Sequence, residues 1–254
     1  MSAQPTDRNA FLAELSAADY ELFRPHLMSF TLSVGERLQD VGSLVEQVVF
    51  PHGGLAALTM PLRNGGGGGA IVVGRDGFVG GFAAAATAPA MCDAEVYIGG
   101  RAARMSASAF RYVLDQSPLV RRLASRYNAA LMVQAHQTAL CNAAHAVEAR
   151  IARWLLEVLD RSGGFEVPLT QSTLAHMLGV QRTTVNLAAG RLEEAGVINC
   201  RRGYMQIVRR EQLERHACEC YRSVKAYVAH LHALPAAAAA APPTPAAETV
   251  RKPA

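Results

Sequence analysis

The 254-residue sequence predicts an α+β protein in which an antiparallel β-roll, or double-stranded β-helix, precedes a long helix and a winged helix-turn-helix. From Met28 to about Met105, short β-type runs alternate with glycine-rich turns, a spacing typical of a small barrel or double-sheet roll. A long helical pattern then continues to Ala144, and a compact helical unit follows it. We expect the units at residues 1–118, 119–145 and 146–225, with a C-terminal extension at 226–254.

The composition predicts a soluble protein of the cytoplasm. Hydrophobic residue types make up 50% of the chain and charged types 18%, so the chain can bury a large core. No run of eighteen apolar residues occurs, and the N-terminal segment lacks the basic and apolar regions of a signal peptide. We therefore expect no membrane partner.

The charged residues are divided unevenly between the two halves of the chain. Residues 1–118 contain 8 Lys and Arg against 11 Asp and Glu, whereas residues 119–254 contain 17 against 10. A basic C-terminal half favours a polyanionic partner for that half of the molecule.

The first half is predicted to form a helical lead-in at residues 7–26, followed by the strands FTLSV, QVVF, AALTM, AIVVG and AEVYI. Five consecutive glycines, Gly65–Gly69, lie between two of these strands. Neither a lysine nor a helix start follows them, so we interpret the run as a flexible hairpin loop and not as a phosphate-binding loop.

The middle of the chain is predicted to be helical. One helix begins near Ser106, breaks at Pro118 and resumes at Leu119–Ala144, where its apolar side needs either the roll or a second copy of the helix as a partner. An amphipathic helix at Ala146–Asp160 carries the single tryptophan, Trp154, which we place in the core. The Pro/Ala-rich residues 235–254 are predicted to be a disordered tail.

Residues 170–195 have the pattern of a helix-turn-helix. Thr170 is a good N-cap for a short helix, Gly179 permits a sharp turn, and Gln181–Glu194 forms a second helix. Two short strands joined by the basic turn Arg201-Arg202-Gly203 follow as a wing, and a helix at Glu211–Cys220 closes the unit. An ordinary αα-hairpin would use the same apolar residues. The polar outward face that begins Gln-Arg-Thr-Thr, together with the wing, favours DNA binding instead.

The chain resembles transcription regulators of the Crp/Fnr family over residues 11–225. The resemblance rests on LTQSTLAHMLGVQRTTVNLAAGRLEEAGVI near the C-terminus and on VVFPHGGLAALTMPL and IVVGRDGFVGGFAAA in the roll. It implies a cyclic-nucleotide-binding-like sensor domain, a dimerising helix and a DNA-binding domain. The partners that it implies are double-stranded DNA at inverted repeats, a second copy of the chain, and RNA polymerase.

The resemblance also implies roles for individual residues. Arg182 falls at the recognition-helix arginine that reads guanine, and Thr183 and Asn186 fall on the same face as base contacts. The positions where relatives touch phosphates, or which lie on the wing, are Thr170, Ser172, Gln181, Thr184, Arg201 and Arg202. Relatives often have Glu at the position of Thr183 and Arg at the position of Leu187, so a different half-site is expected.

Several cofactors of the family are not expected in this chain. Cyclic-nucleotide binders have a Glu where Gly81 stands and an Arg about ten residues later, where the segment TAPAMCDAE offers none. No cysteine precedes Cys92, so the N-terminal iron–sulfur ligands are missing. Haem stays open at His26 or His52, although a lone histidine is more often a surface or core residue. We therefore predict no cofactor.

Two other interpretations compete with the regulator. The five cysteines include Cys218-Glu-Cys220 with His216 nearby, but a C-x-C without a second pair is poor zinc spacing, so we interpret them as ordinary thiols and expect no metal. A cupin-like enzyme would need clustered His and Glu on neighbouring strands, which the roll lacks, so no catalytic residue is assigned. A sensor that acts through a protein partner, with a weakened DNA head, is the remaining alternative, supported by Leu187.

Overall fold

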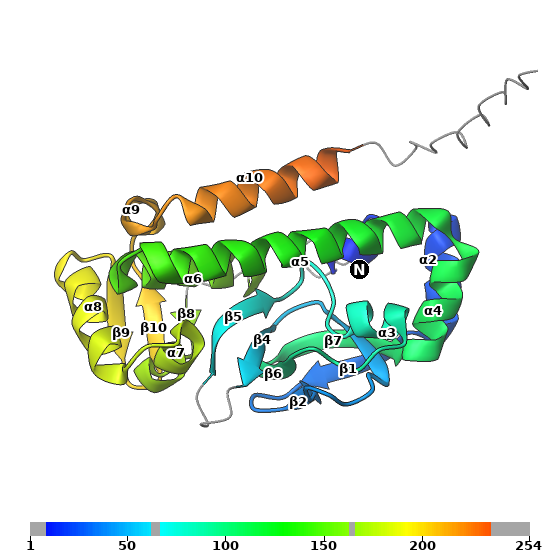
Figure 1. Cartoon of the computed structure of the whole chain (residues 1–254), viewed down its shortest axis with the longest axis horizontal. Coiled ribbons are helices and arrows are strands. Elements are labelled where there is room, and N and C mark those ends of the chain that lie inside the picture. The colour runs from blue at the N-terminus through cyan, green and yellow to red at the C-terminus, as the bar shows by residue number, and fades with distance from the viewer. Residues whose placement is uncertain (1–8, 62–66, 163–165, 235–254) are drawn as a thin grey trace, which may run out of the picture.

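The computed structural model describes residues 9–61, 67–162 and 166–234. A long helix, α5 (Pro118–Ala144), runs along the molecule with a β-roll on one side and helix α10 (Cys220–Ala233) on the other, and a winged helix-turn-helix lies at one end (Figure 1). The predicted α+β architecture is confirmed. No helix among the described residues is both long and apolar enough to cross a membrane.

The roll consists of two antiparallel sheets. The four-stranded sheet has the order β2 (Arg37–Gln39), β6 (Asp93–Ile98), β4 (Leu55–Pro61) and β5 (Gly67–Val73). The three-stranded sheet has the order β1 (Met28–Leu32), β7 (Gly100–Ser106) and β3 (Gln47–Pro51). Between β5 and β6 the chain forms a short helix, α3 (Gly81–Ala86), which the sequence analysis does not predict.

The glycine run differs from its prediction. Residues 62–66 lie outside the described part of the chain, but Gly67–Gly69 belong to β5 and pair with β4, where Gly68 lies opposite Met60. The prediction of a loop over all five glycines is therefore wrong, because pairing with β4 holds Gly67 and Gly68 in an extended strand that continues through Gly69.

The lead-in forms two short helices, α1 (Ala10–Ala13) and α2 (Ala17–Phe23), and then a 3₁₀ turn at Arg24–His26. Asn9 caps α1 and Ser16 caps α2, so each helix begins at a side chain that accepts a backbone hydrogen bond. The lead-in closes one end of the roll with an aromatic cluster that comprises Phe11, Phe23, Phe50, Phe78 and Phe110.

Serine N-caps determine where the two helices of the middle segment begin. Ser106 caps α4 (Ala107–Gln116), and Ser117 caps α5, whose first residue is Pro118. Helix α5 ends at Ala144, with His145 as its C-cap residue, and α6 (Val147–Ser162) carries Trp154, which is buried as predicted.

The winged helix-turn-helix contains α7 (Gln171–Leu178) and α8 (Arg182–Glu194), followed by strands β9 (Ile198–Arg201) and β10 (Tyr204–Ile207). A short strand, β8 (Glu166–Val167), adds a third member to the wing sheet.

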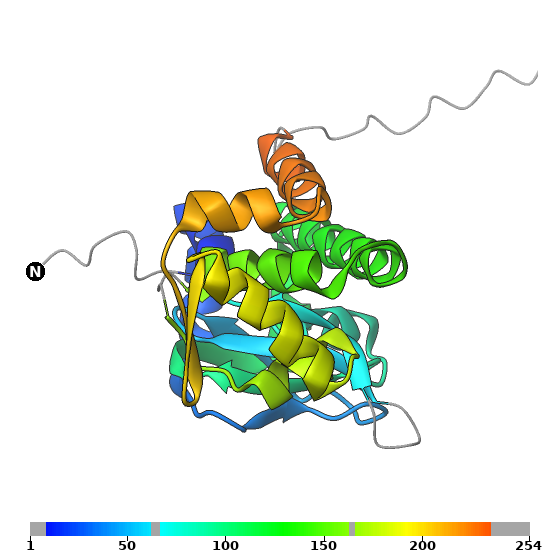
Figure 2. The ribbon, with the colours of Figure 1, turned by 90° about the vertical axis from the view of Figure 1, so that its left-hand side faces the viewer.

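The C-terminal helix differs most from the sequence analysis. The helix expected at Glu211–Cys220 is wrong in its extent, because α9 spans Arg210–His216 and the chain breaks before α10 begins at Cys220. Helix α10 continues past residue 225, the expected end of the DNA-binding unit, and packs along α5, as both views show (Figure 2). The predicted tail at 235–254 lies outside the described residues.

Candidate functional site

Local hydrogen bonds fix the turn between α7 and α8. Thr170 Oγ1 accepts a hydrogen bond from the Thr173 backbone N–H at 3.1 Å and so caps α7. Gly179 adopts a left-handed conformation with φ of 63°, and Val180 N–H donates to Ala175 O at 3.0 Å. The apolar side of α8, which comprises Val185, Ala188, Ala189 and Leu192, is buried. The opposite side of α8 is thereby directed outward.

The three predicted base contacts lie together on this outward side of α8. Arg182, Thr183 and Asn186 are all exposed, and Arg182 is the first residue of the helix. Leu187 lies beside them with 71% of its surface exposed. An arginine and an asparagine can read base edges in the major groove, whereas an exposed leucine can contact only apolar groups such as the thymine methyl.

The predicted phosphate contacts surround the first turns of the two helices. Thr170 and Ser172 lie at the start of α7, and Gln181 and Thr184 lie at the start of α8. Thr170, Gln181 and Thr184 are exposed, and the Gln181 side chain makes no capping bond. The N-terminus of a helix presents free N–H groups and a positive dipole end, which together attract phosphate.

The wing arginines extend the positive surface. Arg201 ends β9 and pairs with Tyr204 of β10, and Arg202 lies in the tight turn between them, where Gly203 takes φ of 88°. Both arginines are exposed. Within the part of the chain that the structure describes, neither Arg201 nor Arg202 nor Arg182 forms an ion pair, so their charges are available to an anionic partner.

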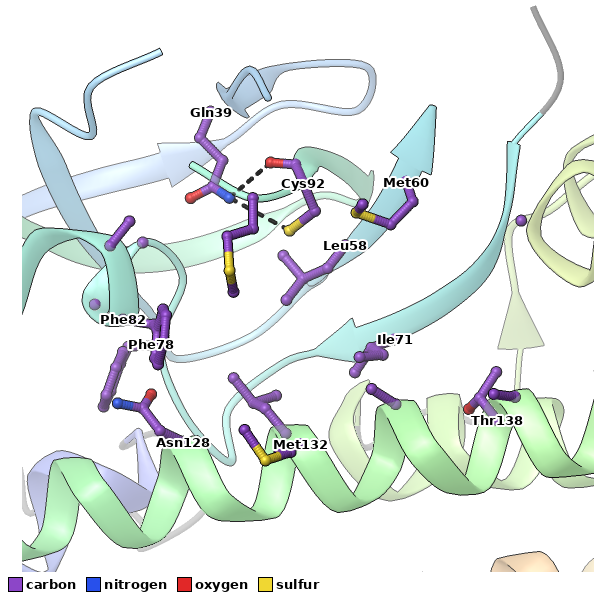
Figure 3. A pocket seen from close by; sticks show the side chains of 18 of the residues that line it. Gln39, Leu58, Met60, Ile71, Phe78, Phe82, Cys92, Asn128, Met132 and Thr138 are labelled. Atoms are coloured by element: carbon purple, nitrogen blue, oxygen red, sulfur yellow. Dashed lines mark hydrogen bonds between the residues drawn. The ribbon is translucent and has the colours of Figure 1, made fainter. Parts of the chain in front are cut away.

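A cavity of about 510 Å³ lies between the roll and α5 (Figure 3). Its walls are largely apolar and sulfur-containing side chains, among them Leu58, Ile71, Phe82 and Met132. The polar side chains in the wall are uncharged: Gln39, Asn128, Thr138 and Asn142. The buried oxygens Gln39 Oε1, Asn128 Oδ1 and Asn142 Oδ1 accept no hydrogen bond from any described residue. Among the described residues, the cavity wall therefore offers acceptors but no charge.

The structure explains why residue 81 is not an acid. Gly81 is the first residue of α3, and a Cβ atom on it would lie 2.1 Å from Phe78 Cε2. Phe78 is buried in the aromatic cluster, so moving it aside would disturb the core packing.

The two histidines considered for haem both have neighbours in the structure. His52 accepts a hydrogen bond at Nδ1 from the Asn9 N–H at 3.1 Å, and His26 lies against Tyr112.

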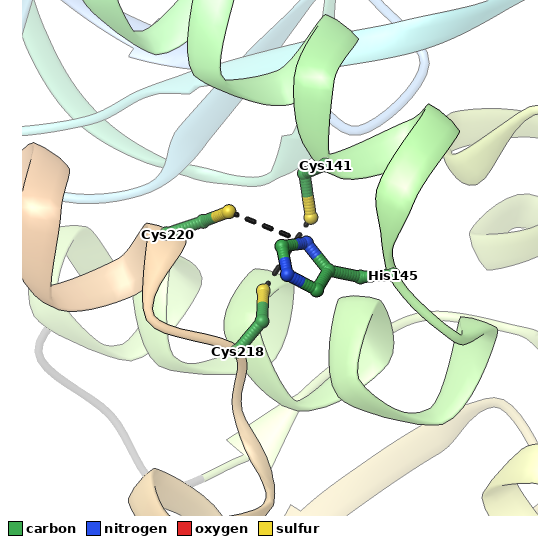
Figure 4. Close-up of side chains that lie close together, drawn as sticks. All are labelled: Cys141, His145, Cys218 and Cys220. Carbon is green, nitrogen blue, oxygen red and sulfur yellow. Dashed lines mark hydrogen bonds between the residues drawn. The ribbon is translucent and has the colours of Figure 1, made fainter.

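Apart from the helix-turn-helix surface and the cavity, the structure contains a second cluster of polar side chains, made of three cysteines and one histidine, which the sequence patterns did not predict. Cys141, His145, Cys218 and Cys220 converge where α5 ends and α10 begins (Figure 4). Cys141 Sγ and Cys218 Sγ lie 3.4 Å apart, and the hydrogen bond between them lowers the pKa of Cys141 and raises the pKa of Cys218. The signal that sequence could have offered is the four-residue spacing of Cys141 and His145, which places both side chains on one face of a helix.

Comparison with known protein families gives a match to the C-terminal part of the chain. Residues 149–216 match the Crp-like helix-turn-helix domain. No curated protein sequence matches the chain.

Solved structures with a similar fold include the following three. FixK2 from Bradyrhizobium japonicum is 17% identical with a TM-score of 0.60, over 76% of this chain and 98% of that one. The c-di-GMP responsive global regulator CLP of Xanthomonas campestris is 14% identical with a TM-score of 0.63, over 76% and 100%. The CRP/FNR family regulator TTHA1359 from Thermus thermophilus is 19% identical with a TM-score of 0.61, over 75% and 98%. The predicted resemblance is confirmed: the chain carries a Crp-like helix-turn-helix and has the fold of Crp/Fnr-type regulators.

Proposed function

We propose that this Crp/Fnr-type chain is a sequence-specific DNA-binding transcription regulator that binds inverted-repeat operators as a homodimer. The observation that carries the proposal is the outward side of α8, where Arg182, Thr183 and Asn186 are exposed beside two unpaired wing arginines. Helix α8 enters the major groove with its N-terminal turn foremost. The wing and the helix N-termini then contact the phosphates on either side.

Arg182 supplies the main base contact in this arrangement. Its guanidinium is able to donate two hydrogen bonds to one guanine. Thr183 and Asn186 read neighbouring base edges, and Leu187 makes an apolar contact with a thymine methyl. Thr170, Ser172, Gln181, Thr184, Arg201 and Arg202 bind phosphates and hold the helix in register.

The exposed side of α5 supports the dimer. Residues 125, 129, 132, 136, 139 and 143 recur at alternating spacings of four and three, and this stripe is exposed except at the half-buried Ala129. We call it the α5 seam. It contains three alanines and Met132, which is 57% exposed, and such a seam packs against a second copy of itself. A two-fold axis through the seam would place two α8 helices in successive major grooves, about 34 Å apart.

The cavity supports regulation by a small molecule. Met132 and Ala139 line the cavity and also lie on the α5 seam, so a ligand there would touch the dimer contact directly. The lining residues that the structure describes offer no positive charge for a cyclic phosphate, and the free acceptors suit a neutral, largely apolar molecule with hydrogen-bond donors. Such a ligand would act by shifting the population of two seam arrangements.

A second candidate is a sensor that acts through a protein partner and has a weakened DNA head. The observation that favours it is Leu187, a large apolar side chain that is 71% exposed at the centre of the proposed DNA surface. In that case α8 would contact an apolar protein surface in place of the major groove. The proposed regulator and this sensor both need no catalytic group, so we assign no enzyme activity.

The test is a selection of genomic DNA fragments by the purified full-length protein at low salt, run beside Arg182→Ala and Arg191→Ala. Arg191 lies on the same helix but faces Glu148, 3.9 Å away, so its loss controls for charge alone. We expect an enriched inverted repeat that Arg182→Ala loses and Arg191→Ala keeps. The expected cost of Arg182→Ala is about 1–3 kcal/mol for each half-site of the inverted repeat.

Two results would contradict the proposal. Enrichment that is identical for the wild type and Arg182→Ala would show that α8 does not read bases. Absence of binding at low salt, together with capture of one protein partner that Leu187→Ala abolishes, would favour the sensor. A steep negative dependence of the association constant on salt would support phosphate contact.

A further inference from the structure

The four side chains of the second cluster come from two segments far apart in sequence. Cys141 lies in the last turn of α5, and His145 caps that helix. Cys218 lies in the connection between α9 and α10, and Cys220 is the first residue of α10. Each offers one donor atom, and all four donor atoms lie within 4.8 Å of one another (Figure 4). The fold thus gathers three sulfur donors and one nitrogen donor around one point.

The spacing of these donors suits a single ion. Cys141 Sγ lies 3.4 Å from Cys218 Sγ, and Cys220 Sγ lies 3.5 Å from His145 Nδ1. A tetrahedral zinc ion, with bonds of about 2.3 Å to sulfur and about 2.0 Å to nitrogen, has ligand atoms about 3.5–3.8 Å apart. The donors need to shift by only a few tenths of an ångström to a little over one ångström. We propose that Cys141, His145, Cys218 and Cys220 bind one Zn²⁺ ion.

The groups around the cluster suit the bound state. His145 faces Cys220 with Nδ1, and its Nε2 lies 3.1 Å from Glu219 Oε1, the pairing by which carboxylates orient zinc-bound histidines. Gln137 Nε2 donates to Cys220 Sγ at 3.0 Å and would stabilise that sulfur as a thiolate.

The charge balance also suits an ion. Three thiolates and Zn²⁺ carry a net charge of −1, and the guanidinium groups of Arg150 and Arg153 interact electrostatically with Cys141. Each thiol releases its proton to solvent when it binds the ion, and no redox change is required.

A disulfide or an iron–sulfur cluster explains fewer of the observed contacts than a zinc ion does. A disulfide between Cys141 and Cys218 would use two of the four groups and leave the His145–Cys220 contact and the Glu219–His145 pair without a role. A cluster of several irons would have to fit its irons and sulfides between ligands that lie only 4.8 Å apart or closer. A closed set of three cysteines and one histidine is a structural zinc arrangement.

The ion would hold α10 on α5 at the junction with the DNA-binding domain. The cysteines are buried, while the side chains of His145 and Glu219 reach the surface and give the metal an entry path. Because α6 starts just after His145 and Cys218 follows α9, the ion would tie both ends of the winged helix-turn-helix to α5.

The test is the metal content of the full-length protein, purified without chelator from zinc-supplemented cells. We expect about one zinc per chain by elemental mass spectrometry. Replacement by Co²⁺ should give the strong visible bands of a tetrahedral ion with thiolate charge transfer. Cys141→Ser and Cys220→Ser should lose the metal, whereas Cys92→Ser and Cys200→Ser, which alter the cysteines outside the cluster, should keep it.

A second measurement covers the case in which the cluster variants fail to fold. In the wild type, zinc should slow the alkylation of Cys141, Cys218 and Cys220 relative to the same protein treated with a chelator, while the rate at Cys92 stays the same with and without the metal. The proposal would be overturned by protein that is purified without metal and in which added zinc changes the alkylation rate of none of the five thiols, by a mapped Cys141–Cys218 disulfide in protein purified without oxygen, or by iron with acid-labile sulfide in place of zinc.

Discussion

The Arg161 guanidinium donates a hydrogen bond through Nε to Asp76 Oδ2 at 2.9 Å, and this ion pair joins the helix-turn-helix domain to the roll. Arg161 belongs to α6 and its side chain is only 9% exposed, while Asp76 follows β5 and also accepts a bond from the Gly74 N–H through Oδ1. Gly74 allows the close approach, because a Cβ there would lie 2.8 Å from the Arg161 Cβ. Burial alone would lower the pKa of Arg161, but Asp76 and Glu157 raise it above its usual value.

Asp76→Asn should therefore destabilise the contact between the two domains. The change leaves a buried guanidinium with only the Glu157 carbonyl as a strong acceptor, at a cost of about 1–3 kcal/mol in the free energy of unfolding. Thermal unfolding should show a lower Tm. Asp40→Asn, which removes a pair with Arg37 on the surface, is the control and should leave the Tm nearly unchanged. Equal Tm values for the two variants would show that the buried Arg161–Asp76 pair contributes no more to stability than the exposed Arg37–Asp40 pair.

The wing arginines should contribute to affinity without contributing to sequence preference. Arg201→Ala and Arg202→Ala should each weaken DNA binding to a similar extent on specific and random duplexes. Each should also reduce the slope of log K against log salt by about 2, because the dimer loses one phosphate contact in each of its two copies. Arg24→Ala, an arginine beside α2 at the opposite end of the molecule, is the control and should change neither quantity (Figure 1). A loss of affinity for one operator sequence, without a loss for random duplexes, would show that the wing arginines contact bases and not only phosphates.

Periodic and capping patterns predicted most elements of this fold. The strands of the roll, the break at Pro118 and the turn at Gly179 follow from signals that lie within a few residues of one another. These local signals also placed Arg182, Thr183 and Asn186 on the exposed side of α8, where the structure has them. Helix α3 escaped notice because its sequence, GFAAAA, has no periodic polar face and simply extends a turn between strands.

The metal-ligand cluster could not be predicted in the same way. Cys218 and Cys220 lack a second nearby pair, and their partners Cys141 and His145 lie more than seventy residues earlier. Only the packing of α10 along α5 brings the two halves together, and α10 is a helix that the sequence patterns did not predict, because the last predicted helix was Glu211–Cys220. The expectation of ordinary thiols rested on spacing within one segment, whereas the cluster is built from two.

The α5 seam should hold the two copies together. Met132→Glu would place two carboxylates against each other at the two-fold contact, and the dimer should dissociate because like charges there are desolvated. Sedimentation at micromolar concentration should show a monomer. The control is Met28→Glu, since Met28 on β1 is 54% exposed and Met132 is 57% exposed. A monomeric wild type, or a dimer that Met132→Glu leaves intact, would remove the seam from the interface.

Glu219 should set zinc affinity through the orientation of His145, with which it shares the 3.1 Å contact. Glu219→Gln keeps the size of the side chain but removes the charge, and loss of such a partner typically weakens zinc binding about 10–100-fold. Competition with a chromophoric chelator measures this change directly. Glu21→Gln, which alters an exposed pair near α2, should leave the zinc affinity unchanged.

Removal of the metal should in turn lower the stability of the whole junction. Free zinc at a hundred times its Kd stabilises the folded chain by about 2.7 kcal/mol, and 1 kcal/mol shifts the Tm of a chain of this size by about 2–4 °C. A chelator should therefore lower the Tm of the wild type by about 5–10 °C and leave Cys141→Ser unaffected, because that variant has already lost its ion. If the chelator shifts both proteins equally, the effect comes from somewhere other than the cluster. If it shifts neither, although the wild type loses its zinc, the ion does not hold α10 on α5.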